Sequence, residues 1–268
     1  MNQNNSSKSV EPGEIMALTR HFLKTEFQPV LRLILKYVLP FLLLLAYLQV
    51  TLQIKITTAA TLAGDLSPDR LVTELSGMYG NLLLILFFHQ FVLALLGATL
   101  YSYFLAVHRG DKKTTNPSEP AQLLFPLSVA AIPVLLMATI ISLFGLMLFV
   151  VPGIVVANYL SLSLFTAVYE QKGTLHALGR SLVMVRNNWW KLLLLNLTGI
   201  AIIYLVNIVV GLPSLIYQKA SGTLGTTQIM PAWHWWMAGL GIVISSIAYI
   251  VPMLFHAFVY LALNKSEE

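Results

Sequence analysis

The side chains best placed for chemistry are polar residues that interrupt long apolar runs: His89, Asn158, Ser161, Asn196, Asn207 and His256. An ionisable group inside a membrane is costly and is therefore a candidate functional site, which applies to the two histidines. Amides and hydroxyls more often join membrane helices, each hydrogen bond contributing about 0.6–2 kcal/mol. Two interpretations stay open: these residues hold helices together, or they line a polar path.

Intramembrane catalysis finds little support in the sequence. No Asp or Glu falls inside a predicted span, none occurs from 171 to 266, and the chain has no cysteine. Metal-dependent hydrolysis needs oxygen ligands, and proton-coupled carriers usually place carboxylates in their spans. His89 and His256 are expected at different depths, so they cannot share one ion. We therefore expect no catalytic residues, no metal site and no cofactor.

Six apolar runs must position these side chains. The chain of 268 residues is 57% hydrophobic and 10% charged, with a mean hydropathy of +0.76. A membrane span needs about 20 mostly apolar residues. The runs are 33–54, 82–107, 123–148, 152–169, 192–212 and 237–263. They predict an all-α, polytopic membrane protein with six transmembrane helices in a single domain, 14–268, after a disordered tail, 1–13.

The Lys and Arg residues predict the orientation. Only Lys55, Arg70 and Lys219 fall on the outer side when the N-terminus is placed in the cytoplasm, and the other 13 of 16 fall inside. Because short loops rich in Lys and Arg stay cytoplasmic, both termini are expected inside. The pI near 9.4 could suggest nucleic acid, but the basic residues flank spans and form no separate domain. We expect no nucleic-acid partner.

Two amphipathic segments are expected to lie on the cytoplasmic membrane surface. The first, 14–28, has an apolar face opposite Arg20 and Lys24, and Arg32 and Lys36 continue the basic spacing. The second follows Gly173 and carries its apolar residues at helical spacing. Its candidate lipid-interface residues are Arg180, Arg186, Trp189, Trp190 and Lys191. Basic and aromatic residues at a span's end anchor it among headgroups. The alternative for the first segment is a soluble cap packed on the bundle.

The arrangement suggests a weak internal duplication, with an interfacial helix and two spans in each copy, 14–107 and 174–263. Between the copies, 123–169 contains no charged residue. As one helix it would be about 70 Å long, over twice the hydrocarbon thickness. It must therefore fold back, and Pro152-Gly153 is the expected place, with Pro152 in the first turn of the next helix.

The segment 150–193 carries Pro152-Gly153, Glu170 at the end of a span, Arg180-Ser181 and Asn188-Trp189. These features resemble a bacterial multi-span membrane-domain family. That family includes the non-catalytic membrane domain of glycerophosphodiester phosphodiesterases and stand-alone inner-membrane proteins of unknown function. The resemblance implies the architecture and location in the bacterial inner membrane (plasma membrane). The phosphodiesterase barrel is absent from this sequence, so the resemblance implies no enzymatic activity.

The sequence thus predicts a non-catalytic integral membrane protein. It would organise the membrane or serve as a platform for a protein partner, with the basic interfacial helices binding anionic lipid headgroups. The alternative is a small transporter or lipid-handling permease, with Asn158, Asn196 and Asn207 lining its path.

Overall fold

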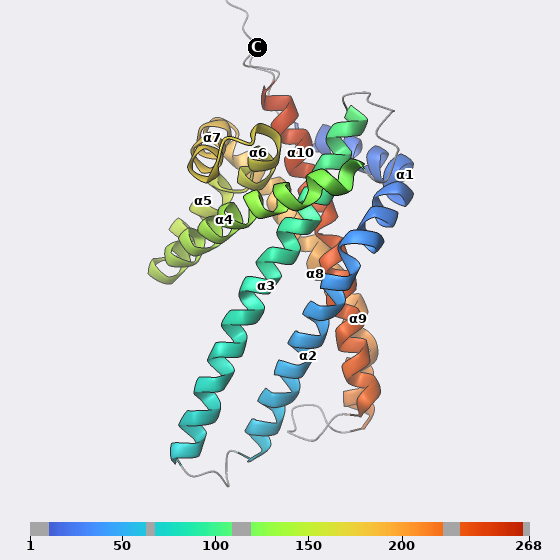
Figure 1. The fold of residues 1–268 in the computed structure, drawn as a ribbon, viewed down its shortest axis with the longest axis vertical. Helices are drawn as coiled ribbons and strands as arrows, with labels where there is room; N and C mark the ends of the chain where they lie inside the picture. The colour runs from blue at the N-terminus through green and yellow to red at the C-terminus, as the bar shows by residue number, and fades with distance from the viewer. Residues whose placement is uncertain (1–10, 63–67, 109–118, 222–230, 265–268) are drawn as a thin grey trace, which may run out of the picture. The chain divides into compact units, whose positions relative to one another are not determined.

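The computed structural model describes residues 11–62, 68–108, 119–221 and 231–264, and every regular element in these ranges is an α-helix. The helices are α1 (Pro12–Tyr37), α2 (Leu39–Leu62), α3 (Pro68–His108), α4 (Glu119–Leu148), α5 (Val150–Tyr159), α6 (Ser163–Glu170), α7 (Thr174–Arg186), α8 (Trp189–Ala220), α9 (Ala232–Ala248) and α10 (Ile250–Asn264). Figure 1 shows them in chain order. The predicted all-α class is confirmed. Of the predicted tail 1–13, residues 1–10 lie outside the described ranges, and Pro12 and Gly13 already belong to α1.

Five stretches of the described chain are long and apolar enough to cross a membrane. They are Leu39–Ala59, Ser76–His108, Val150–Glu170, Trp189–Ala220 and Trp233–Asn264. A sixth apolar stretch, Val129–Gly145 within α4, is shorter. Each of the six predicted runs therefore has a helical counterpart, and five of these have the length and composition of a span.

The first predicted span begins later than expected. Pro29 lies inside α1, and the helix is interrupted only at Val38, whose carbonyl accepts from the amides of Phe41 and Leu42, at 3.0 Å each. Pro40 stands in the first turn of α2, where a helix does not use the missing N–H. Arg32 and Lys36 consequently belong to the end of α1, not to the start of a span.

The fourth predicted span is divided into α5 and α6. The hydroxyls of Ser161 and Ser163 donate to the carbonyls of Asn158 and Leu160, at 2.8 and 2.6 Å. Local bonds of this kind compete with the regular helical ladder. The sixth predicted span is divided too, at Tyr249 between α9 and α10, where Pro252 supplies no N–H. Sequence periodicity did not reveal either break.

The chain forms two compact units. Unit 1 contains α1, α3 from Leu93 onward, α4 to α7, α8 up to Ala201, and α10. Unit 2 contains α2, α3 up to Val92, α8 from Ile202 onward, and α9.

Aromatic rings fill the centre of unit 1. The ring of Phe104 lies 5.4 Å from Phe22 of α1 and 4.9 Å from Phe258 of α10. Phe165 of α6 lies 4.8 Å from Tyr101 and 5.0 Å from Tyr260. Such pairs add about 0.5–1.5 kcal/mol each beyond area burial. They fix α6 and α10 side by side, which positions the polar residues described below.

Helix α1 packs along only one edge of its apolar face. Ile15 and Phe22 are buried, and Glu26 accepts a hydrogen bond from Tyr103 of α3 at 2.5 Å. Leu18 and Phe27, on the same face, remain 41% and 43% exposed. The helix therefore combines packing on the bundle with an uncovered apolar edge.

Unit 2 contains close helix contacts at small residues. Gly239 of α9 faces Val50 of α2, and a Cβ on Gly241 would lie 3.1 Å from Val210 of α8. Close approach at small residues is the usual way for membrane helices to associate.

Large apolar side chains cover the outside of the long helices. In α8, Ile200, Tyr204 and Leu205 are each more than 60% exposed. Only 11% of the apolar 18-residue stretch of this helix is buried. A water-soluble surface rarely carries a contiguous apolar patch of this kind. Length, composition and exposure together are those of a multi-pass membrane protein.

Candidate functional site

A tight turn between α6 and α7 creates the most polar site of unit 1. Gln171 has φ 54° and Gly173 has φ 95°, which reverses the chain within three residues. A side chain at the second position would be strained, and glycine adopts this conformation without penalty. The reversal lays α7 back along α6, so that side chains from the first two turns of α7 face the end of α6.

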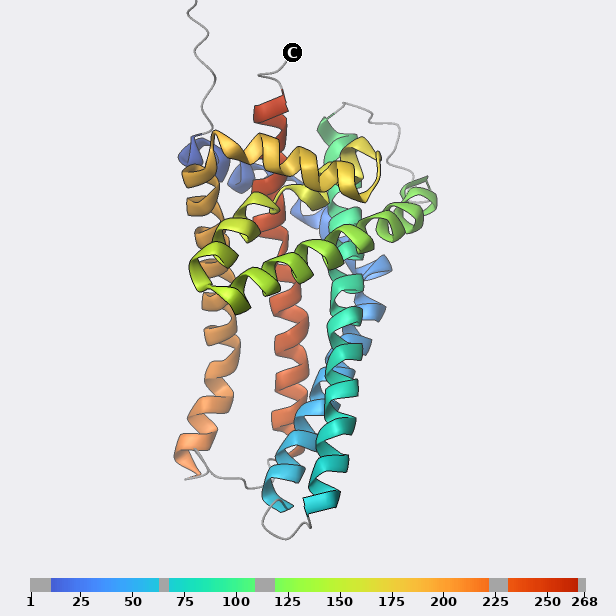
Figure 2. The same cartoon turned by 90° about the vertical axis from the view of Figure 1, so that its left-hand side faces the viewer.

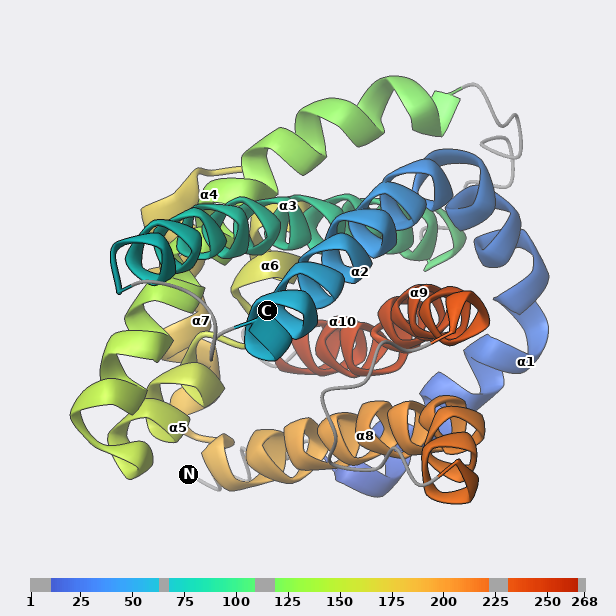
Figure 3. The same cartoon turned by 90° about the horizontal axis from the view of Figure 1, so that it is seen from below.

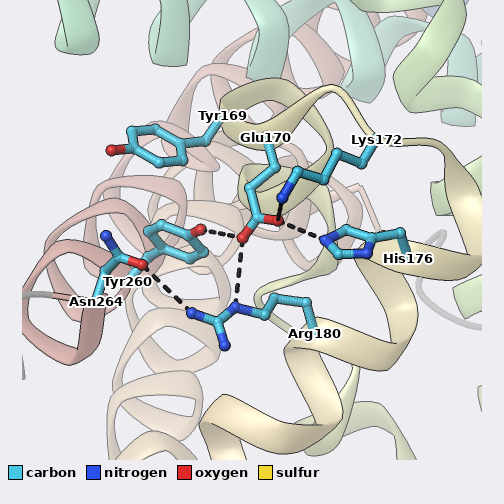
Figure 4. Close-up of a pocket in the computed structure, with 7 residues that line it drawn as sticks. All are labelled: Tyr169, Glu170, Lys172, His176, Arg180, Tyr260 and Asn264. Carbon is cyan, nitrogen blue, oxygen red and sulfur yellow. Dashed lines mark hydrogen bonds and ion pairs between the residues drawn. The ribbon is translucent and has the colours of Figure 1, made fainter. Parts of the chain in front are cut away.

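The carboxylate of Glu170 lies at the centre of this site (Figure 4). His176 Nε2 lies 2.5 Å from Glu170 Oε2, and Tyr260 donates its hydroxyl hydrogen to Oε1 at 2.5 Å. Arg180 Nε lies 3.4 Å from Oε1, and Lys172 Nζ lies 3.8 Å from Oε2. The carboxylate side chain is only 12% exposed. Several donors thus compensate its partial burial, as a buried charge requires.

The site opens into a pocket of about 370 Å³. Its lining residues are Tyr169, Glu170, Lys172, His176, Arg180, Tyr260 and Asn264. Arg180 Nη2 donates to Asn264 Oδ1 at 3.4 Å, which ties α7 to the end of α10. Two permanent cations, Lys172 and Arg180, face one carboxylate, so the pocket carries net positive charge even with His176 neutral. This balance suits an anionic group, above all a phosphate.

The sequence indicated Arg180 as a lipid-interface residue and Glu170 as the end of a span, but it did not predict the pocket. The balance of charges around Glu170 could have indicated it. No carboxylate occurs from 171 to 266, so Glu170 is the nearest anion in the chain for Lys172, His176 and Arg180, which follow it by 2, 6 and 10 residues. The contribution of Tyr260 and Asn264 depends on α10 packing beside α6, which local patterns do not show.

A second polar cluster of unit 1 is a directed series of hydrogen bonds between helices. His256 Nε2 of α10 lies 2.7 Å from Asn196 Oδ1 of α8. Asn196 Nδ2 donates to Asn158 Oδ1 of α5 at 2.8 Å, and Asn158 Nδ2 donates to the carbonyl of Trp189 at 3.0 Å. Both asparagine side chains thus use their nitrogen and their oxygen in hydrogen bonds. The cluster therefore brings together three of the predicted intramembrane polar residues.

The remaining predicted polar residues are not part of this interhelical series. In unit 2, Asn207 donates to the carbonyl of Ile203 in its own helix and accepts from Ser245 of α9 at 2.8 Å. Ser161 donates to the carbonyl of Asn158. His89 is half-buried on α3. All three predicted asparagines thus meet a polar atom of another helix, the arrangement expected of residues that hold helices together.

The predicted lipid-interface residues divide into two groups. Five basic side chains are exposed, namely Arg20, Lys24, Arg32, Lys36 and Arg186. Trp190 is 76% exposed, whereas Trp189 and Lys191 are half-buried. Arg180 is drawn into the pocket by Glu170, so its charge is partly compensated.

The described residues contain no group of three or more His, Cys, Asp or Glu side chains that could hold a metal ion. Comparison with protein-family models, curated proteins and solved structures found no match.

Proposed function

We propose that the chain is a non-catalytic integral membrane protein that binds anionic lipid headgroups at its cytoplasmic face. There it organises the surrounding membrane or serves as a platform for a partner. The observation that carries this proposal is the net-positive pocket of Glu170, Lys172 and Arg180, lined by donors that suit a phosphate. Exposed basic residues of α1 and α7 support it, because each contributes about 1 kcal/mol near an anionic leaflet.

The orientation belongs to the same proposal. The Lys and Arg distribution favours cytoplasmic termini, and α2, α3, α8 and α9–α10 supply four crossings. The predicted six crossings add α4 and α5–α6 as a pair. That pair would enter and leave on one side, so both counts put the two termini on the same side of the membrane. Together with the Lys and Arg distribution, this supports a pocket that faces the anionic cytoplasmic leaflet. The resemblance to bacterial membrane domains supports a plasma-membrane location.

The contacts of the asparagines favour this function over a transporter. A polar path needs amides that face a water-accessible space. Asn158 and Asn196 instead bond to each other and to neighbouring helices, and Asn207 bonds to Ser245.

The test is lipid binding to the full-length protein in detergent, measured by native mass spectrometry with phosphatidylglycerol and phosphatidylethanolamine. The double variant Lys172→Gln/Arg180→Gln should reduce phosphatidylglycerol binding about tenfold, which is the ratio for a loss of about 1.4 kcal/mol. Phosphatidylethanolamine binding should change little. Lys219→Gln, at the far end of α8, removes one positive charge as Lys172→Gln does; it is the control for that single variant and should behave as wild type.

The single variant Lys172→Gln separates binding from folding. The Lys172 side chain is 64% exposed and lies 3.8 Å from the carboxylate, so its loss should leave the fold intact. Equal phosphatidylglycerol binding by wild type and both variants would refute the proposed site.

A further inference from the structure

The hairpin of α4 and α5 ends in an uncovered apolar tip. Its residues are Phe144, Met147, Leu148, Phe149, Val150 and Val151, each at least 64% exposed. No charged residue occurs from 123 to 169. Figures 1 and 3 agree in showing α4 and α5 side by side, with their turn pointing away from α10. Such a tip is not a water-exposed loop, because turns facing water are polar.

Phe149, at the turn between the two helices, uses both of its backbone polar groups within the hairpin. The amide of Phe149 donates to the carbonyl of Gly145 at 3.0 Å, and the amide of Gly153 donates to the carbonyl of Phe149 at 3.1 Å. A Cβ on Gly145 would lie 2.9 Å from Gly153 Cα, so the two helices are in backbone contact. Non-helical backbone can enter hydrocarbon only when its polar groups are paired. Phe149, the one residue between the two helices, meets that condition.

The base of the hairpin is held at the start of α8. Asn158 Nδ2 donates to the carbonyl of Trp189, the first residue of the α8 span, at 3.0 Å. Ser181 Oγ of α7 donates to the carbonyl of Tyr159 at 2.7 Å. The end of α5 therefore lies at the level where α8 enters the membrane.

Helix α6 stays at that level and does not complete a crossing. The carbonyl of Tyr159, the last residue of α5, accepts a hydrogen bond from Ser181, and Glu170 at the end of α6 contacts His176 and Arg180. Both ends of the segment thus contact the single helix α7. Figure 2 shows α7 running across the axis of α10. The stretch Val150–Glu170 has the length of a span but is folded, with α6 lying along α7.

The hairpin arms are too short to cross a bilayer. Helix α5 has 10 residues, which rise about 15 Å at 1.5 Å per residue. The hydrocarbon core is about 30 Å thick. On the other arm, Val134 packs with Leu160 and Leu178 at the base. The tip can therefore reach only about the middle of the membrane.

We infer that α4 and α5 form a re-entrant hairpin whose apolar tip inserts among the acyl chains of the cytoplasmic leaflet and returns to the same side. The occupant of the exposed tip is thus lipid hydrocarbon. Four helical segments cross the membrane: α2, α3, α8 and α9–α10. The inserted tip adds volume to one leaflet only.

Depth measurement on the full-length protein tests this inference. Because the natural chain has no cysteine, single-cysteine variants need no other change. Phe149→Cys reports the tip, Gln171→Cys the base, and Ser221→Cys the far end of α8. Each is treated with a membrane-impermeant maleimide in right-side-out and inside-out vesicles. Phe149→Cys should react from neither side, Gln171→Cys only from the cytoplasmic side, and Ser221→Cys only from the outside.

A bimane label on Phe149→Cys, attached in detergent, then reports what surrounds the tip in liposomes. Quenching should be at least twofold stronger with lipids brominated at the acyl-chain middle or end than with headgroup-proximal bromine. External labelling of Phe149→Cys would show a crossing hairpin, and cytoplasmic labelling at the rate of Gln171→Cys would place the tip in water. Absence of quenching by any brominated lipid would show that protein covers the tip. Each of these three results would overturn the inference.

Discussion

Glu170 is the residue on which the pocket depends. It accepts from Tyr260 of α10, pairs with His176 and Arg180 of α7, and ends α6, so one carboxylate connects three helices. Hydrogen bonds to a charged group contribute about 1.5–3 kcal/mol, more than neutral ones. Without the negative charge of Glu170, the side chains of His176 and Arg180 lose the anion that both of them contact.

Glu170→Gln should therefore destabilise the protein by about 2–3 kcal/mol. In a thermal melt of the detergent-solubilised protein, Tm should fall by several degrees. Glu14→Gln, an exposed carboxylate in the first turn of α1, is the control and should leave Tm almost unchanged. An unchanged Tm for Glu170→Gln would mean that the pocket contacts do not hold α6, α7 and α10 together.

Asn196 is the central residue of the hydrogen-bonded series, with partners on α5 and α10. Asn196→Leu removes two interhelical hydrogen bonds and should cost about 1.2–4 kcal/mol at 0.6–2 kcal/mol each. Asn207→Leu, which loses one interhelical bond to Ser245, should cost about half as much. Thermal shifts of both variants, with exposed Asn187→Leu as control, measure the ranking. Shifts near zero for both would favour the transporter interpretation.

At the scale of elements, hydropathy predicted where helices occur but not where they break. The six apolar runs are all helical, because a helix pairs the backbone polar groups of an apolar segment within the segment itself. The divisions at Leu160 and Tyr249 were missed because they do not change the hydropathy. Ser161 and Ser163 act through local hydrogen bonds to the carbonyls of Asn158 and Leu160, and Pro252 acts through its missing N–H. Of the turn between α6 and α7 that forms the pocket, the sequence indicated only Gly173.

Gly173 tests the importance of that turn. Its φ of 95° is strained for any other residue, so Gly173→Ala should cost about 1–2 kcal/mol. It should also weaken phosphatidylglycerol binding, because α7 carries Arg180. Gly179→Ala is the matched control, since Gly179 is helical and a Cβ there meets nothing within 4 Å. That control should be neutral or stabilising by up to about 1 kcal/mol. Equal effects of the two substitutions would contradict the role of the turn.

For the whole molecule, the lipid-binding pocket and the re-entrant hairpin require the same side of the membrane. The pocket binds anionic lipid only if it faces the cytoplasmic leaflet, and the hairpin enters that leaflet only if its base lies on the same side. The all-α class and the positions of the apolar helices were predictable from sequence because composition acts over long stretches. The number of crossings and the orientation stay predictions. The pocket was not predictable, because Glu170, Arg180 and Tyr260 are brought together by tertiary packing.

The direction in which α8 crosses the membrane tests the proposed orientation most directly. Reporter fusions after Lys191 and after Ser221 bracket the helix in an otherwise intact upstream chain. A reporter pair active on opposite sides, such as alkaline phosphatase and a fluorescent protein, gives each position a positive signal. We expect a cytoplasmic signal after Lys191 and an external signal after Ser221. An external signal after Lys191 would contradict the proposed orientation, because the pocket and the base of the hairpin would then face the wrong leaflet.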